Sequence, residues 1–324
     1  MKKRILCFFL TVVMLVSAVN ISASTIAVEN NPIAEYSETA TESLTQYVDM
    51  RFGTDNDSLC TIGPNRPNAS VSPGPDTYPR SYSTGYKASA PIRGFSQIHV
   101  QAGEPNYSNF LLSPQIGLST ALDSHDSAKA NENPTASEYS VTLSKYDIDV
   151  ALTLAEHSVF YKFTYPESSE ASLVIDMAYD NTLNDSNPQD INISASTDAD
   201  GNTIVYGYAQ YDIGYEYFYA VANKAAKKIG TYTGSETNDA VSITGYNTDS
   251  TTAETGVGVY LQFDTSADEE ILFKIGVSFR SFDKAKEWLE KEIPAWDYDA
   301  LKAVTNEIWE NLLSKVQISG NLTE

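Results

Sequence analysis

Apolar and polar residues alternate along most of the chain, and this period of two predicts β-strands with one buried face. The alternation runs over residues 148–154, 159–163 and 173–177, and it is clearest over 257–263 and 271–279. The charged run 264–270 joins the last two strands, so we expect them to form a hairpin. No helical period of useful length occurs before Ser281. Many short strands of this kind predict an antiparallel β-sandwich rather than a parallel sheet.

Turn residues separate the predicted strands, because glycine, Asp and Asn favour the backbone conformations of tight turns. We expect turns at Asp200-Gly201-Asn202, Gly207, Gly214, Gly230-Thr231 and Gly245-Tyr246-Asn247.

The hydrophobic period becomes helical after Ser281. Apolar residues at 285, 288, 289 and 293, and then at 301, 304, 308, 312 and 316, predict two amphipathic helices interrupted at Pro294. The second helix is expected to begin at Asp297 or Asp299. All three tryptophans of the chain lie in this tail: Trp288, Trp296 and Trp309. Such aromatic residues either pack back on the sheet or face a further domain, and the sequence leaves both readings open.

Residues 1–23 have the features of a secretory signal peptide. Lys2, Lys3 and Arg4 precede an apolar run over 5–19 that is short for a membrane span, and cleavage is expected near 23–27. We therefore expect a secreted protein without a membrane association after cleavage, with a disordered linker over 24–45, a strand-rich domain over 46–280 and linker helices over 281–318. Cys60 would be the single cysteine of the mature chain, which excludes an intramolecular disulfide.

The chain has a net charge of -22 at pH 7. This argues against nucleic acid and anionic membranes as partners. Solubility of an exported protein explains the charge, and an acid-rich metal-binding surface is the alternative.

Motifs for the common enzyme classes are absent from the sequence. The three histidines His99, His125 and His157 are scattered, which excludes a structural zinc cluster. Residues 55–57 and 198–201 carry Asp in calcium-loop-like spacing, but without the further oxygen ligands that such loops need, so we interpret both as turns. There is no nucleophile elbow, phosphate-binding loop or dinucleotide fingerprint. With 43 acidic residues, no catalytic pair of carboxylates can be selected from composition.

The segment 91–114 is the strongest candidate for a binding site, because a predicted strand opens there into a loop rich in Gly, Pro and Asn before a second strand. It combines aromatic and hydrogen-bonding side chains that suit a polar ligand, with the positions Arg93, Phe95, Gln97, His99, Glu104 and Tyr107 as candidate substrate contacts. It has no complete catalytic set. The chain also has 21 tyrosines, several of them over 206–219. Their flat rings would suit sugars, although tyrosine is also a common strand residue.

Several motifs in this order resemble the N-terminal domain of glycoside hydrolase family 92, the exo-acting, calcium-dependent α-mannosidases. The family run GFSH-T-H-L-S-G-T-G is similar to Gly94 to Val100, with Gln97 in place of the first His. The other matching runs are Val48-Asp49 with Phe52-Gly53-Thr54, Ser72 to Thr77, Gly85-Tyr86, Tyr139-Ser140-Val141, Tyr165-Pro166, and Glu292 to Asp299 with Trp309. The resemblance extends over residues 46–318. Gln101 to Glu104 depart from the family's S-G-T-G run.

The resemblance implies a mainly β fold, an antiparallel β-supersandwich followed by two C-terminal linker helices that lead to a C-terminal (α/α)6 barrel. It implies an inverting mechanism on mannose-containing glycans, as in N-glycan degradation. The general acid, the general base and most calcium ligands belong to the barrel, so no catalytic residue and no metal ligand is expected in this chain. It would then be inactive alone and contribute the substrate contacts of the loop over 91–114. The alternative is a stand-alone, lectin-like carbohydrate-binding protein, and a gene fragment is a third possibility.

Overall fold

The computed structural model describes residues 43–54, 60–79, 84–99, 110–179, 190–211, 214–245 and 256–316. The expected signal peptide, almost all of the expected linker, and the calcium-loop-like residues 55–57 lie outside these ranges. Of the helices in the described residues, none combines the length and the apolar character needed to cross a membrane.

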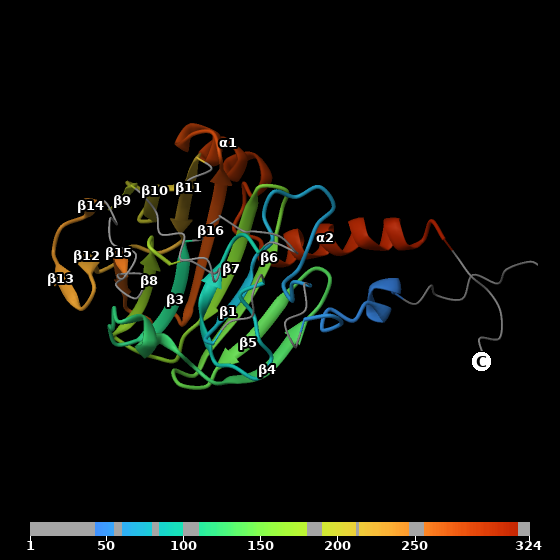
Figure 1. Ribbon diagram of the computed structural model, residues 1–324. Helices are drawn as coiled ribbons and strands as arrows, with labels where there is room; N and C mark the ends of the chain where they lie inside the picture. The colour runs from blue at the N-terminus through green and yellow to red at the C-terminus, as the bar shows by residue number, and fades with distance from the viewer. Residues whose placement is uncertain are drawn as a thin grey trace, which may run out of the picture. The chain divides into compact units, whose positions relative to one another are not determined.

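The described residues from Ser43 onward build two antiparallel sheets (Figure 1). The first has seven strands in the order β1-β2-β3-β8-β15-β12-β13. Their bounds are β1 Gly74–Thr77, β2 Ile92–Ser96, β3 Leu111–Ile116, β8 Ala171–Asp176, β15 Val257–Phe263, β12 Lys228–Thr233 and β13 Glu236–Asn238.

The second sheet has nine strands in the order β14-β9-β10-β11-β16-β7-β6-β5-β4. Their bounds are β14 Ser242–Gly245, β9 Asp190–Thr197, β10 Thr203–Tyr211, β11 Gly214–Ala222, β16 Glu270–Ser278, β7 Ser158–Thr164, β6 Ile148–Leu154, β5 Tyr139–Leu143 and β4 Lys129–Pro134. Two 3₁₀ helices, η1 Leu44–Tyr47 and η2 Leu122–His125, complete the part before the terminal helices.

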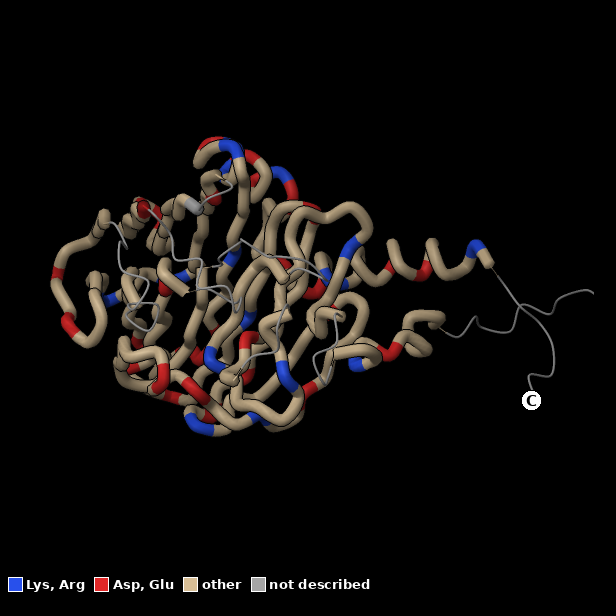
Figure 2. The backbone as a smooth tube through the Cα atoms, in the orientation of Figure 1, with Lys and Arg blue, Asp and Glu red and all other residues tan. Residues whose placement is uncertain are grey.

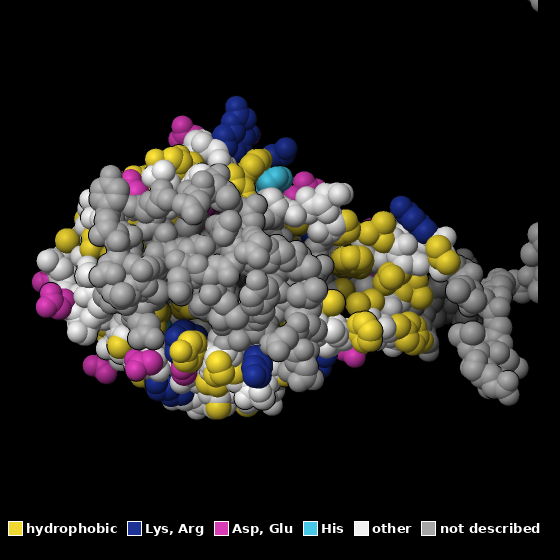
Figure 3. All heavy atoms as spheres, in the orientation of Figure 1, with side chains coloured by type: hydrophobic (Ala, Val, Ile, Leu, Met, Phe, Trp, Pro, Cys, Tyr) yellow, Lys and Arg dark blue, Asp and Glu magenta, His cyan; other side chains and the backbone are white. Residues whose placement is uncertain are grey.

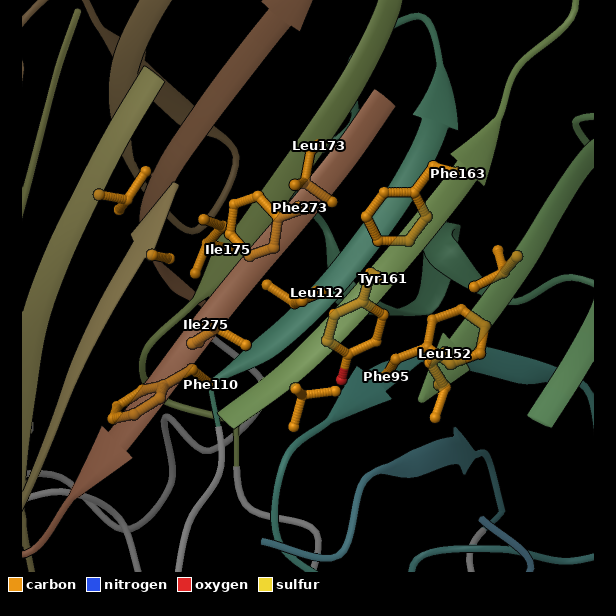
Figure 4. Close-up of a cluster of buried hydrophobic side chains, with 14 of the residues drawn as sticks. Phe95, Phe110, Leu112, Leu152, Tyr161, Phe163, Leu173, Ile175, Phe273 and Ile275 are labelled. Carbon is orange, nitrogen blue, oxygen red and sulfur yellow. The ribbon is translucent and has the colours of Figure 1, made fainter. Parts of the chain in front are cut away.

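The main core lies between the two sheets. Side chains from both of them, such as Leu112 and Leu173 from the first and Tyr161, Phe163 and Phe273 from the second, are fully buried against one another (Figure 4). Burial of this apolar area is the main stabilising contribution, since the chain has no disulfide in the described residues. The predicted antiparallel β-sandwich is therefore confirmed. Charged residues lie mainly in turns and helices around it (Figure 2).

The prediction of a hairpin between residues 257–263 and 271–279 was wrong. β15 pairs with β8 and β12 in the first sheet, whereas β16 pairs with β7 and β11 in the second. The charged connection therefore crosses from one sheet to the other. Alternation indicates only that one face of a strand is buried, and it does not identify the neighbouring strand. β15 and β16 each bury one face in the same core, from opposite sides.

Two central strands are buried on both faces, contrary to the prediction of one buried face. In β8, Val174 is covered on the outer side by the rings of Tyr232 and Tyr260. The outer face of β16 is covered by the first terminal helix, whose Ala285 carbonyl oxygen would lie 2.4 Å from a Cβ at Gly276.

Two glycines predicted as turns lie inside strands. Gly207 belongs to β10, where a Cβ would approach the Asn192 carbonyl oxygen to 2.5 Å, and Gly230 belongs to β12, where a Cβ would lie 2.2 Å from the Tyr260 ring. Both positions need glycine because a neighbouring atom occupies the space of a side chain. The turn at Gly201 is confirmed, with a φ of 82° between β9 and β10.

The two predicted terminal helices are present as α1 Phe282–Glu292 and α2 Tyr298–Leu313. Ser281 caps α1 by accepting from the Lys284 amide. Asp297 caps α2 by accepting from the Ala300 amide, and it is one of the two residues at which the second helix was predicted to begin. α1 covers β11 and β16, and the first part of α2 lies against β6 and β7. None of the three tryptophans is fully buried, with Trp296 36% exposed.

From Val304 onward, α2 and the residues just after it keep apolar side chains in solvent. Val304 is 47% and Leu312 36% exposed, and Val316, beyond the helix end at Leu313, is 75% exposed, although all three follow the predicted apolar stripe. Figure 3 shows such hydrophobic side chains along the segment where α2 and η1 lie together. The helical tail thus packs on the sheet at its start and leaves an apolar face uncovered at its end.

Glu310 of α2 holds η1 in place. Its carboxylate accepts from the backbone amides of Leu44 and Thr45 at 2.8 and 3.0 Å, and from the Ser43 and Thr45 hydroxyls. The Ser43 hydroxyl and the Thr45 amide lower the pKa of Glu310 to about 2. The carboxylate therefore satisfies the free amides at the start of η1, as a capping side chain would.

We predict that Glu310→Ala releases residues 43–47 from α2 without unfolding the sandwich. Amide hydrogen exchange at Leu44 and Thr45 should accelerate in the variant, while exchange in the β16 core should not change. Because the folded pKa is lowered, the attachment is present at neutral pH and is lost as the pH falls through about 2. Glu307→Ala, an exposed neighbour on the same helix, is the control. Unchanged protection at Leu44 would contradict the capping role.

Candidate functional site

Arg93 in β2 is held by a bidentate ion pair. Its Nε and Nη2 donate to the two carboxylate oxygens of Asp126 at 2.8 and 3.0 Å, and its Cζ lies 3.9 Å from the centre of the Tyr78 ring. Burial alone would lower the pKa of Arg93, but the Asp126 carboxylate outweighs burial and the pKa is raised. The side chain is 9% exposed, so the pair fixes a guanidinium whose Nη1 is left for a further acceptor.

Phe95 and Gln97 point into the sandwich. The Phe95 ring is fully buried, with its centre 6.5 Å from that of Tyr139 (Figure 4). Gln97 is also fully buried, and its Nε2 donates to the Tyr161 hydroxyl at 3.1 Å while its Oε1 has no hydrogen-bond partner. In the described residues these two side chains support the base of the loop from inside, and their contact with a substrate stays a prediction.

His99 joins β1 to the end of β2. Its Nδ1 lies 2.8 Å from the Ser72 carbonyl oxygen and therefore donates to it. Its Nε2 faces both the Asp76 carboxylate and the Ser96 hydroxyl at 3.3 Å. Burial lowers the pKa of His99, and the neighbouring Asp76 carboxylate outweighs it, so that the pKa is raised. The protonated ring can thus form an ion pair with Asp76, which is itself fully buried and has one oxygen without a partner.

Ser96, His99 and Asp76 do not form a catalytic triad. In a Ser-His-Asp triad the serine and the aspartate bind different ring nitrogens. Here Ser96 and Asp76 share the same nitrogen, and the other nitrogen is used by a backbone carbonyl. The arrangement orients the chain just before residues 100–109. Glu104, Tyr107 and the altered run Gln101 to Glu104 lie in that segment, outside the described residues.

A second candidate site, which the sequence reasoning missed, is a pocket of about 470 Å³ between the α1–α2 connection and the β6–β7 turn. It is lined by Arg66, Ala155, Glu156, Lys291, Glu292, Ile293, Pro294, Ala295, Asp297, Ala300, Leu301 and Val304. The Nε atom of Arg66 is buried without a hydrogen-bond partner. Burial lowers the pKa of Arg66, and the Glu156 and Glu292 carboxylates oppose this effect. The pocket therefore offers one unsatisfied donor beside two carboxylates.

His157 closes one side of this pocket region. Its Nδ1 and backbone amide bind the two oxygens of Glu292 at 2.6 and 3.0 Å, and its ring stacks on Trp288 with centres 3.8 Å apart. Glu156, His157 and Glu292 bring possible metal-ligand atoms within 4.8 Å of one another. Both Glu292 oxygens are already used by His157, so nothing in the described residues points to an ion here. The motif at 292–299 could have drawn attention to this place, but Arg66 and Glu156 carry no local sequence signal.

The turn at residues 198–202 accounts for the calcium-like spacing of its carboxylates. The Asp198 carboxylate accepts from the backbone amides of Asp200 and Asn202 and from the Asn202 side chain, all at 2.8 to 2.9 Å. It stabilises its own turn, as Asp does in Asx turns.

Comparison with known proteins gives one family and several related folds. The model of the glycosyl hydrolase family 92 N-terminal domain matches residues 47–278. An uncharacterized secreted glycosidase of Arthroderma benhamiae is 26% identical over 313 residues, covering 86% of this chain and 39% of that protein.

Two solved structures from Bacteroides thetaiotaomicron share the fold. A family GH92 α-mannosidase has a TM-score of 0.74 at 23% identity, covering 87% of this chain and 39% of its own. A family GH92 inverting mannosidase has a TM-score of 0.70 at 19% identity, covering 88% and 38%. The chain thus spans about two fifths of the length of the relatives that it matches.

Proposed function

Because this chain belongs to the family of glycosyl hydrolase family 92 N-terminal domains, we propose that it is the substrate-covering part of a secreted glycoside hydrolase that removes mannose from mannose-containing glycans. The observation that carries the proposal is the family match over 47–278 together with the coverage of only 39% of the relatives' length. One solved relative is an α-mannosidase and the other an inverting mannosidase, and the curated relative is an uncharacterized secreted glycosidase.

In this proposal the loop that follows β2 lies over the bound sugar. The His99–Asp76 pair anchors the start of the loop to β1, and the Arg93–Asp126 pair ties β2 to the end of η2. Arg93, through Nη1, and the loop residues Glu104 and Tyr107 would contact sugar hydroxyls, and Phe95, Gln97 and His99 would hold the loop in register. Inverting hydrolysis needs a general acid and a general base on opposite sides of the sugar ring. We propose that a C-terminal (α/α)6 barrel partner supplies both.

Calcium would also come with that partner. Ca²⁺ prefers six to eight oxygen ligands. The three-residue group at Glu156, His157 and Glu292 offers a histidine nitrogen and a carboxylate already bound to that histidine. The residues of this group do not fit calcium, and no step of the reaction is assigned to them.

The uncovered apolar face of α2 is the place where we propose that the partner packs. Val304 and Leu312 on α2 and Val316 just after it are exposed, as are Tyr47 and Phe52 in the neighbouring N-terminal segment, at 68% and 81%. Contiguous exposed apolar side chains commonly mark protein interaction surfaces. This arrangement favours a partner domain beside the helical tail over a chain that functions alone.

The proposal predicts that the isolated chain releases no mannose. An aryl α-mannoside and a mannobiose should be incubated with the chain in the presence of calcium, and free mannose should stay at the level of the buffer blank. Turnover that a chelator abolishes would overturn the proposal.

Reading the gene beyond the codon for Glu324 and the neighbouring frames is the second test. A barrel-encoding sequence supports the two-part enzyme, and its absence from the genome overturns it.

A further inference from the structure

The outer face of the nine-stranded sheet carries a wall of aromatic rings. On β10 and β11, Tyr206, Tyr208, Tyr215 and Tyr217 alternate with residues that point into the core. The ring centres of neighbouring tyrosines are 5.4 to 5.8 Å apart, and Phe282 at the start of α1 lies 5.0 Å from Tyr217. These rings form one continuous surface, which we call the tyrosine face.

Packing explains only part of the tyrosine face. Phe282 contacts the rings of Tyr206, Tyr208 and Tyr217, as expected for rings that stabilise a sheet. Tyr206 and Tyr215 nevertheless keep 38% and 39% of their surface exposed. The exposed parts of these two rings are therefore accessible to a ligand.

Neutral polar side chains continue the same face on the adjacent strands. Tyr208 lies opposite Asn192 of β9, which lies opposite Thr244 of β14. Tyr206 lies opposite Ser194, which in turn lies opposite Ser242. Directly paired residues point to the same side of an antiparallel sheet, with strands about 4.8 Å apart. Each of these two sets of three paired residues therefore places one aromatic ring beside two hydrogen-bonding side chains, over about 10–15 Å of the sheet surface.

The strands of the face have little charge. In the described residues of β9, β10, β11 and β14 there is no Lys or Arg, and the one carboxylate on their tyrosine side is that of Asp190, which accepts from the Tyr208 hydroxyl at 3.0 Å. A cation adjoins the face from α1, where the Lys286 Nζ lies 5.3 Å from the ring centre of Tyr219. Burial, and then the Asp190 carboxylate, raise the pKa of Tyr208 to about 12, so its hydroxyl stays a neutral donor. A nucleic acid would need basic residues. Tyrosine is also enriched in the cores of protein interfaces, so the rows of small polar side chains are what favours a sugar here.

We propose that the tyrosine face, with Asn192, Ser194, Ser242 and Thr244, is a carbohydrate-binding surface for a neutral oligosaccharide chain. The C–H face of a pyranose ring matches an aromatic ring, and its hydroxyls match amide and hydroxyl side chains. The surface belongs to the second sheet, whereas the loop after β2 belongs to the first (Figure 1). It therefore does not require the proposed hydrolase function, and it predicts binding by the isolated chain.

The test is affinity electrophoresis of the whole chain in native gels that contain yeast α-mannan, mixed-linkage β-glucan, xylan or starch. We expect retardation by at least one polysaccharide. The double variant Tyr206→Ala with Tyr215→Ala should weaken it about tenfold or more, as truncation of exposed aromatic anchors does. Tyr206→Phe with Tyr215→Phe should retain most of the binding, because the rings remain. Circular dichroism and the thermal midpoint verify that each variant is folded.

Phe52→Ala controls for the loss of any exposed aromatic ring, because Phe52 lies outside both the tyrosine face and the loop after β2. Retardation that survives Phe52→Ala and is lost in the double alanine variant supports the tyrosine face, whatever the outcome of the mannose-release assay. Retardation by none of the polysaccharides, or equal retardation of the wild type and the double alanine variant, overturns the inference.

Discussion

Asp76→Ala is expected to lower the free energy of unfolding by about 3–5 kcal/mol at pH 6, because it removes one partner of a buried charged pair and leaves the other uncompensated. Both residues are almost inaccessible to solvent, with Asp76 0% and His99 6% exposed. The pair also connects β1 to the end of β2, so its loss should loosen the start of the loop that follows. Urea denaturation followed by tryptophan fluorescence measures the effect.

The effect of Asp76→Ala should depend on pH with a definite sign. The folded pKa of His99 is raised by Asp76, so the contribution of the pair is fully present below the unfolded histidine pKa of about 6.5. It is lost as the pH rises through the folded pKa. The stability difference between the wild type and the variant should therefore decrease from pH 6 to pH 9. A difference that stays constant would contradict a protonated His99.

His125 provides a matched control with the opposite sign. It is also buried, between the Ser113 hydroxyl and the Ser119 carbonyl, and burial lowers its pKa to about 4. Its contribution should be lost as the pH falls from about 6.5 towards 4. The difference between the wild type and His125→Asn should thus change below pH 6.5 and not above it.

Glu216→Leu is expected to raise the free energy of unfolding by about 1–3 kcal/mol at pH 7, the cost of burying a polar group without a hydrogen bond. Glu216 is 1% exposed on the inner face of β11, and neither carboxylate oxygen has a hydrogen-bond partner among the described residues. Burial raises its pKa well above the usual value. The wild type should therefore lose stability as the pH rises from about 4.5 through the folded pKa, and the variant should not.

Glu216→Gln separates charge from polarity in the same experiment. The amide has nearly the same shape and cannot ionise, so it should remove the pH dependence while keeping the desolvation cost of a polar group. Denaturation curves of the wild type, Glu216→Leu and Glu216→Gln between pH 4 and 9 measure both effects. A leucine variant that is less stable than the wild type at pH 7, with an unchanged pH profile, would show that the carboxylate has a stabilising partner.

Local patterns predicted which residues form strands and helices better than they predicted which strands pair. The caps at Ser281 and Asp297 are chemical signals within one turn of chain, and both helices begin where those residues indicate. Alternation identified β15 and β16 but assigned them to one hairpin. Each has an inward face, and the two faces meet across the core instead of side by side in one sheet.

The sequence indicated candidate residues only within one continuous segment. Arg93 and Phe95 lie in β2, and Gln97 and His99 follow it, while their contact with a substrate stays a prediction. Their partners could not be found in the same way, because Asp126 and Tyr161 come from other parts of the chain. The pocket at the α1–α2 connection was missed for this reason, since Arg66 and Glu156 approach it only in the folded chain. The glycines inside β10 and β12 were misread because close packing and turns both select glycine.

The placement of β15 and β16 has a consequence for how the protein folds during synthesis. β16 stands between β11 and β7, and β15 stands between β8 and β12, although they are the last two strands in the described residues. Until residue 263 has emerged, the strands of the first sheet form two separate groups with open edges, and the same holds for the second sheet until residue 278 has emerged. Folding must therefore wait for nearly the whole domain and depends on contacts distant in sequence, which slows it. A nascent chain stopped before residue 257 is expected to need chaperone protection. A nascent chain that reaches residue 279 is expected to complete both sheets.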